Sequence, residues 1–183
     1  MAKIAIFLAD GFEEIEALTV VDLCRRAGLT IDMVSVMKDV FVKGSHGIEV
    51  KADKLIGDVK FDEMDMLVLP GGMPGTTNLE KTDKLMEQIR AFDDAKKYIS
   101  AICAAPGIFG RAGLLNGKKA CVFPGLEGEL KGADVQMTET TVDGHILTSR
   151  GMGTALAFGL AIVERFCGKE TADELGKKVV YRA

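Results

Sequence analysis

Between residues 98 and 107 the chain reads Tyr98-Ile99-Ser100-Ala101-Ile102-Cys103-Ala104-Ala105-Pro106-Gly107. The apolar first half predicts a buried strand over 98–102, and the small residues and proline that follow are typical of the start of a helix. We expect this helix to end near Gly113. Cys103 therefore lies at the joint between a strand and a helix.

The same alternation of strand, loop and helix recurs on both sides of this segment. We expect strands at 3–8, 30–36, 65–69 and 145–148, with further candidates at 119–122 and 134–137 and a hairpin formed by 40–42 and 48–50. We expect helices at 14–26, 79–95, 154–167 and 170–177. This order predicts an α/β fold with a mostly parallel sheet covered on both faces, whose ligand sites lie at the carboxyl ends of the strands.

The composition sets limits on the class of protein. A chain of 183 residues with 48% hydrophobic and 27% charged residues fits one globular domain over 1–183. The longest apolar stretch, 151–163, is too short for a bilayer, and the N-terminal residues run straight into a strand-like segment, so we expect a cytoplasmic protein with no membrane partner. The net charge of −4 comes from interspersed charges without a basic run, which argues against nucleic acid as a partner.

The four cysteines lack the paired spacing of a metal site, so we expect free thiols and no metal. Cys24 and Cys167 lie on apolar helix faces and are expected in the core, whereas the position of Cys121 stays open. Cys103 is different because its sulfur faces the unpaired amides and positive dipole end of the following helix, which favour the thiolate. A buried structural cysteine is an equally good interpretation of its position alone.

Glu16 is a candidate acid or base in the first turns of the helix expected at 14–26. We expect Ile15, Leu18, Val21 and Cys24 to form the core-facing stripe, with Glu16 at its edge near the end of the first strand. A carboxyl there would be partly desolvated and could move a proton to or from a thiol. For any single glutamate of this turn, however, a surface position is the more frequent alternative.

The glycine-rich loop at 71–75 follows a strand and presents backbone amides to a phosphate or to a developing oxyanion, although a simple tight turn has the same sequence. A dinucleotide site is disfavoured because the first loop lacks G-x-G-x-x-G and carries Asp10, Glu13 and Glu14. The two histidines, His46 and His145, do not adjoin Cys103, so the sequence shows no base for a Cys-His pair.

Four segments together resemble the ThiJ/PfpI superfamily, which includes the parkinsonism-associated deglycase family and a bacterial ThiJ- and YajL-like branch. They are Ala9 to Glu16, Leu69 to Gly72, Ala101 to Pro106, and Ile146 to Thr154, and the match spans nearly the whole chain in the family's order. The resemblance implies a flavodoxin-like three-layer sandwich, similar to the class I glutamine amidotransferase core, and a homodimer.

The same resemblance implies roles for individual residues. Cys103 is then the nucleophile, Glu16 the carboxylic acid hydrogen-bonded to it, and the amides of Gly72 and Ala104 the oxyanion donors, with Gly71 lining the pocket. No cofactor and no metal are expected.

Three departures from the superfamily pattern modify these roles. Ala104 stands where the protease-like branch has a histidine, which argues against peptidase activity. Phe123 precedes Pro124 where the deglycase branch has a histidine, which makes the pocket more apolar. His46 stands where some relatives have arginine, in a hairpin segment that crosses the family's dimer interface. The partner's His46 is therefore expected to approach Cys103.

The resemblance favours a cysteine-dependent enzyme acting on reactive carbonyls, either by glyoxalase III-like conversion of methylglyoxal to lactate or by deglycation of glycated adducts. An alternative is a redox-sensing stress-response protein or chaperone in which Cys103 is oxidised to a sulfinate capped by Glu16. A thiamine-pathway role is suggested by the superfamily's name and supported by no residue. The enzyme and sensor hypotheses share both key residues, so the motifs do not rank them.

Overall fold

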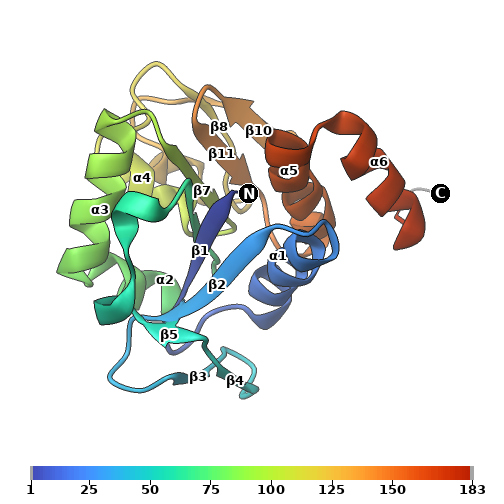
Figure 1. Cartoon of the computed structure of the whole chain (residues 1–183). Helices are drawn as coiled ribbons and strands as arrows, with labels where there is room; N and C mark the ends of the chain where they lie inside the picture. The colour runs from blue at the N-terminus through green and yellow to red at the C-terminus, as the bar shows by residue number, and fades with distance from the viewer. Residues whose placement is uncertain (1, 182–183) are drawn as a thin grey trace.

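The computed structural model describes residues 2–181 and shows one central sheet with helices on both faces (Figure 1). The seven strands lie in the order β10-β11-β7-β6-β1-β2-β5. They are β1 (Lys3–Leu8), β2 (Thr30–Ser35), β5 (Lys54–Leu55), β6 (Met66–Leu69), β7 (Tyr98–Ile102), β10 (Thr140–Asp143) and β11 (Ile146–Ser149). All neighbouring strands are parallel except β10 and β11. The predicted α/β fold with a mostly parallel sheet is therefore confirmed.

Each face of the sheet buries its own apolar cluster because successive strand residues point in opposite directions. In β1, Ile4 and Ile6 belong to the cluster under α1 and α5, whereas Ala5 and Phe7 belong to the cluster under α2, α3 and α4. The last helix, α6, packs against α5 at the edge of the molecule (Figure 1). The helices are α1 (Glu14–Arg26), α2 (Gly75–Glu80), α3 (Asp83–Asp94), α4 (Pro106–Arg111), α5 (Ala155–Cys167) and α6 (Lys169–Lys178).

The buried face of α1 differs from the predicted stripe. Ile15 is 51% exposed and Leu18 only half-buried, whereas Ala17, Val20 and Cys24 are fully buried. The prediction was wrong at the start of the helix because its first turn extends past the sheet, where neighbouring loops cover the acidic side chains instead. Burial of these residues therefore depends on the loops and not on the helical period alone.

The segment expected to be one helix over 79–95 forms two, α2 and α3, with a break at Lys81 and Thr82. Thr82 has an extended backbone as the N-cap of α3, and its hydroxyl donates to the Asn78 carbonyl at 2.9 Å. Threonine favours such an end position because its side chain competes for backbone hydrogen bonds.

The remaining strands form two small sheets outside the main one. The predicted hairpin is confirmed as β3 (Phe41–Lys43) antiparallel to β4 (Glu49–Lys51). The candidates at 119–122 and 134–137 are the shorter β8 (Lys119–Ala120) and β9 (Asp134–Val135), which pair with each other. Strands β5 and β10 were not predicted, and both lie at edges of the main sheet. Between residues 2 and 181, none of the helices is long and apolar enough to cross a bilayer.

The topology brings three loops to one edge of the sheet. The strand order reverses between β1 and β6, and β7 lies next to β6. In a parallel sheet the loops that leave such neighbouring strands meet at their carboxyl ends and form a crevice. Here these loops carry Glu13, Gly71 and Cys103.

Candidate active site

Cys103 has a strained backbone at the turn between β7 and α4. Its φ of 64° lies in the left-handed region, which only Lys96 and Val180 share among the other non-glycine residues between 2 and 181. Such a conformation costs roughly 1–3 kcal/mol and persists only where the surroundings hold it. Here the Cys103 N–H donates to the Ser149 carbonyl at 3.0 Å, and the Phe123 N–H donates to the Cys103 carbonyl at 2.9 Å. The fold thus holds the thiol in a fixed orientation.

Glu16 lies beside this thiol and is only 1% exposed. Its Oε2 accepts a hydrogen bond from the Gly71 N–H at 2.9 Å, and its Oε1 is buried without a hydrogen bond of ordinary geometry. Burial raises the pKa of Glu16 to about 7, although the Gly71 amide and the Cys103 thiol act in the opposite direction. The surface alternative for Glu16 is therefore wrong, and its carboxyl is protonated over a wide pH range.

The pKa of Cys103 is raised rather than lowered. Burial has the largest effect on the thiol and the charge of Glu16 the next largest, and together they raise its pKa to about 12. The backbone amides of Ala104 and Gly72 donate to the sulfur and lower this pKa. The expectation that helix amides would make the thiolate the favoured form is wrong in net direction, because desolvation and the neighbouring carboxylate outweigh them. Since the two groups titrate as a pair, they hold one proton between them above about pH 7.

The glycine loop after β6 forms one wall of the site. A Cβ atom at Gly71 would lie 2.5 Å from Cys103 Cβ and 2.8 Å from Glu16 Oε2, so the thiol and carboxyl approach the chain only because this residue is glycine. Gly72 has a φ of 90° and packs against the backbone amide of Glu13. The Glu13 N–H in turn donates to the Gly71 carbonyl at 2.9 Å. The glycine loop and the first loop are thereby fixed to each other.

Phe123 is half-exposed and contacts the nucleophile through its backbone. Its amide holds the Cys103 carbonyl, and its ring lies next to Gly151, where an added Cβ would be 3.3 Å from the ring. The backbone of Phe123 thus contacts Cys103, whereas an apolar effect of its ring on the pocket stays a prediction.

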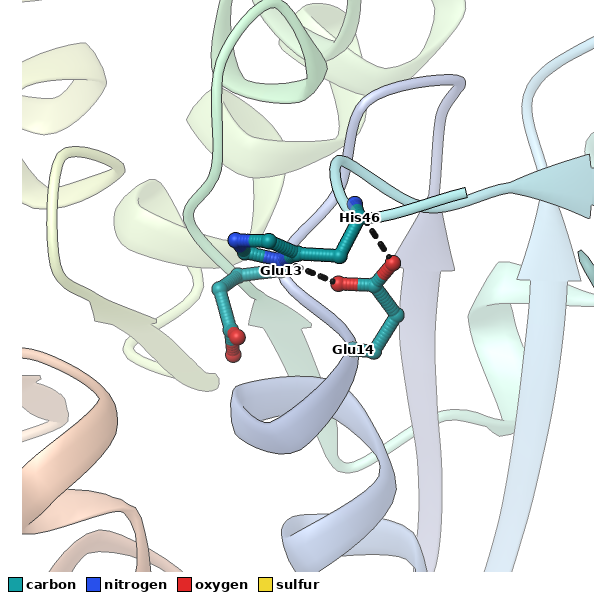
Figure 2. Close-up of side chains that lie close together, drawn as sticks. All are labelled: Glu13, Glu14 and His46. Atoms are coloured by element: carbon teal, nitrogen blue, oxygen red, sulfur yellow. Dashed lines mark hydrogen bonds and ion pairs between the residues drawn. The ribbon is translucent and has the colours of Figure 1, made fainter. Parts of the chain in front are cut away.

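His46 is bound within its own chain, to Glu14 (Figure 2). The His46 Nδ1 lies 2.9 Å from Glu14 Oε2, and the His46 N–H donates to Glu14 Oε1 at 2.8 Å. Hydrogen bonding to Glu14 raises the pKa of His46. Whether His46 also reaches a second subunit stays a prediction.

Glu13, Glu14 and His46 offer metal-ligand atoms within 4.8 Å of one another (Figure 2). Both carboxylates already have structural partners, since Glu13 Oε2 caps α1 by accepting the Glu16 N–H at 2.7 Å and Glu14 pairs with His46. The three glutamates of this turn therefore differ in role, and only Glu16 faces the thiol.

Three other reactive side chains that the sequence analysis considered are buried in the fold: Cys24, Cys121 and His145. The Cys121 thiol is buried and donates to the Thr148 carbonyl at 3.2 Å, and Cys24 is buried with its pKa raised to about 12 by desolvation. His145 is 2.6 Å from Asp93. The sequence analysis missed Ser149, whose carbonyl orients Cys103, because a backbone contact between distant strands leaves no local signal.

A sequence model described as the DJ-1/PfpI family matches residues 2–165. Protein DJ-1 homolog B of Arabidopsis thaliana is 37% identical over 182 residues, which are 98% of this chain but 42% of that protein. Protein DJ-1 homolog A of the same plant is covered to 45%, so the chain spans less than half the length of these two relatives. Protein dj-1beta of Drosophila melanogaster is 33% identical over 180 residues, with 97% of this chain and 96% of that protein covered.

Among solved structures, oxidized DJ-1 of Toxoplasma gondii superposes with a TM-score of 0.96 at 33% identity, and both chains are covered completely. Drosophila melanogaster DJ-1beta superposes with a TM-score of 0.92 at 30% identity, over 98% of this chain and 97% of that one. The likeness thus extends over the sheet, the helices and the loops that carry the site.

Proposed function

The chain belongs to the DJ-1/PfpI family, and from this premise we propose that it is a cofactor-independent enzyme in which Cys103 attacks small reactive carbonyl compounds. Its substrates are aldehydes such as methylglyoxal or the glycated adducts that such aldehydes form. Peptidase activity is not part of the proposal, since Ala104 follows the nucleophile in place of a histidine.

The observation that carries the proposal is the buried carboxyl of Glu16 beside the thiol of Cys103. A general acid or base is most effective when its pKa lies near the working pH, and burial places the pKa of Glu16 at about 7. A surface glutamate would be ionised throughout the physiological range and could not donate a proton. The pair therefore suits a reaction in which a thiol is deprotonated and a carbon-bound proton is moved.

The reaction with methylglyoxal has three steps. Glu16 takes the thiol proton as the sulfur of Cys103 bonds to the aldehyde carbon, and the amides of Gly72 and Ala104, which already point at the sulfur, stabilise the resulting oxyanion. Glu16 passes the thiol proton on to this oxyanion and is then free to accept another proton. It removes the proton of that carbon and delivers it to the adjacent carbonyl carbon, while the hydroxyl proton passes to the neighbouring oxygen, which leaves a thioester of lactate. Water hydrolyses the thioester to lactate and the free thiol, so the overall change is the addition of one water without any external oxidant.

Deglycation of an adduct leads to the same hemithioacetal on Cys103. The amine or thiol of a hemiaminal or hemithioacetal leaves with a proton from Glu16 as the Cys103 sulfur bonds to the carbon that carried it, and the later steps are those of methylglyoxal.

The test is turnover of methylglyoxal by the purified protein, followed by loss of substrate and appearance of lactate. We expect Cys103→Ala to abolish turnover while its melting temperature stays close to that of the parent, since Cys103 is only partly buried and lies at the margin of the apolar cluster under α1 and α5. Turnover retained in Cys103→Ala would refute the nucleophilic mechanism.

A second candidate function is redox sensing by Cys103. The amides that donate to the sulfur, together with the protonated Glu16, could hold the oxygens of a sulfinate, and the solved structure of the similar Toxoplasma gondii protein is described as oxidized. Mass spectrometry after peroxide treatment tests this function: a protein that stops at the sulfinate and lacks carbonyl turnover would favour the sensor over the enzyme.

The proposed assembly is a homodimer. Ile15 and Ile48 are about half-exposed, and with Leu18, Leu156 and Val180 they line a groove of about 660 Å³ beside α1. A contiguous apolar surface of this kind favours association with another protein surface. The groove adjoins Glu14, so a second subunit bound there would lie near the His46 hairpin.

A further inference from the structure

A second cavity of about 340 Å³ lies beside one of the two proposed oxyanion donors. Ala104, whose amide donates to the sulfur of Cys103, forms part of its wall. We name it the Arg111 cavity, and its other walls include Met73, Glu80, Arg111, Leu126 and Glu129. A molecule bound through its reacting carbon to Cys103 can therefore extend its remaining atoms into this space.

The Arg111 cavity carries an excess of negative charge. Arg111 Nε and Nη2 each lie 2.8 Å from a carboxylate oxygen of Glu80, and Arg111 Nη1 lies 2.6 Å from Glu129 Oε2. One guanidinium thus faces two carboxylates, which leaves one net negative charge. Among the described residues, Glu129 Oε1 makes no hydrogen bond, so this oxygen is available to a ligand.

The charged groups are held in place by tight packing against α4. A Cβ atom at Gly110 would collide with the backbone carbonyl of Glu129, so the short helix η3 (Glu127–Glu129) lies directly on α4. Helix α4 begins three residues after Cys103. The backbone of Glu129 is therefore fixed relative to the nucleophile, and its carboxylate is held by Arg111.

From this geometry we infer that the Arg111 cavity binds the non-reacting part of the substrate and selects a cationic group over an anionic one. The inference rests on the proposed carbonyl chemistry of Cys103. Glu129 attracts an ammonium or guanidinium group, and the side chains of Met73 and Leu126 offer apolar walls to the methylenes that lead to it. The favoured substrates are carbonyl adducts that carry a positive charge a few bonds from the reacting carbon.

The first experiment measures the charge preference of the cavity without requiring enzymatic turnover. The protein is treated with trimethylammonioethyl methanethiosulfonate or with sulfonatoethyl methanethiosulfonate, which have similar tails of opposite charge. The Cys103 thiolate attacks the sulfenyl sulfur, methanesulfinate leaves, and a mixed disulfide forms. Mass spectrometry of the Cys103 peptide gives the two rate constants, and each is divided by the rate of the same reagent with free mercaptoethanol.

We expect the corrected ratio of cationic to anionic rates to exceed one in the parent and to fall roughly two- to fivefold in Glu129→Gln, which is the range for one partly exposed ion pair. Glu127→Gln is the matched control, because Glu127 belongs to the same short helix but does not line the cavity. An unchanged ratio in Glu129→Gln, or an equal fall in Glu127→Gln, would overturn the inference.

The second experiment uses substrates that carry the same two tails. Hemithioacetals of methylglyoxal with thiocholine and with mercaptoethanesulfonate are compared by kcat/KM. We expect Glu129→Gln to reduce the preference for the cationic adduct and Glu127→Gln to leave this preference as it is in the parent. Absence of turnover with all three compounds would refute the proposed function, whereas the labelling ratio would still decide the charge preference of the cavity.

Discussion

At the scale of single residues, the proposed chemistry depends on a carboxyl and a thiol that share one buried position. An ionised carboxylate with an unpaired oxygen is costly away from water, which explains why Glu16 keeps its proton up to about pH 7. The same burial makes the Cys103 thiolate costly, so neither group ionises independently of the other.

The Glu16→Gln variant tests whether the carboxyl of Glu16 moves a proton or only supports the structure. Glutamine keeps the shape and a hydrogen-bond donor but cannot accept and return a proton. We expect methylglyoxal turnover to fall by ~10²–10⁴-fold, the usual contribution of general acid–base catalysis, while alkylation of Cys103 by iodoacetamide persists. Glu13→Gln is the control, since its amide oxygen can still cap α1. Equal losses in both variants would indicate a general electrostatic effect instead.

The raised pKa of Glu16 also predicts how stability changes with pH. The folded protein holds a proton on Glu16 up to about pH 7, whereas the unfolded chain releases it near the ordinary glutamate pKa of 4.5. The parent therefore loses stability as the pH rises between these two values, by up to about 3 kcal/mol. Glu16→Gln avoids this loss, so its melting temperature should exceed that of the parent at alkaline pH and match it in acid. A constant difference across this range would contradict the assignment.

At the scale of elements, the ion pair of Glu14 with His46 ties α1 to the hairpin of β3 and β4. Burial works against ionisation of Glu14, but hydrogen bonds from the His46 side chain and from backbone amides outweigh it and lower its pKa to about 2. A lowered pKa stabilises the fold above the unfolded value of 4.5, and this stabilisation is lost as the pH falls towards 2.

We therefore expect Glu14→Gln to melt a few degrees below the parent at neutral pH, with a difference that shrinks between about pH 4.5 and about pH 2. Thermal unfolding by circular dichroism at several pH values measures it. Glu49→Gln makes the same charge change in the exposed strand β4 of the same hairpin and should have little effect. A difference that grows in acid would be inconsistent with this ion pair.

At the scale of the whole molecule, the apolar groove beside α1 predicts a dimer. Ile15→Glu places a charge on this surface without touching the core, because Ile15 lines the groove and is already half-exposed. We expect the parent to sediment as a dimer and Ile15→Glu as a monomer with unchanged secondary structure. Met137→Glu is the control, since Met137 is exposed away from the groove. A monomeric parent would refute the proposed assembly.

Much of the architecture was predictable because its signals are local. The apolar runs of β1, β6 and β7 and the glycine turns after them indicate strands and loops without reference to distant residues. The break between α2 and α3 was missed because the apolar period continues through Thr82, and only its hydroxyl contact with Asn78 marks the end of a helix. The edge strand β10 (Thr140–Asp143) was missed because Val142 is its single apolar residue, so no apolar run marks it.

The sequence by itself determined the α/β class, the mostly parallel sheet and the place of Cys103 between β7 and α4. The reason is that strands and helices are indicated by the spacing of apolar residues among near neighbours in the chain. Only the tertiary structure decided which glutamate faces the thiol, since Glu13, Glu14 and Glu16 differ in what packs around them and not in type. It also decided the direction of the pKa of Cys103 and assembled Arg111, Glu80 and Glu129 from three segments. Desolvation and charge pairing depend on distances in space, which the order of residues along the chain does not contain.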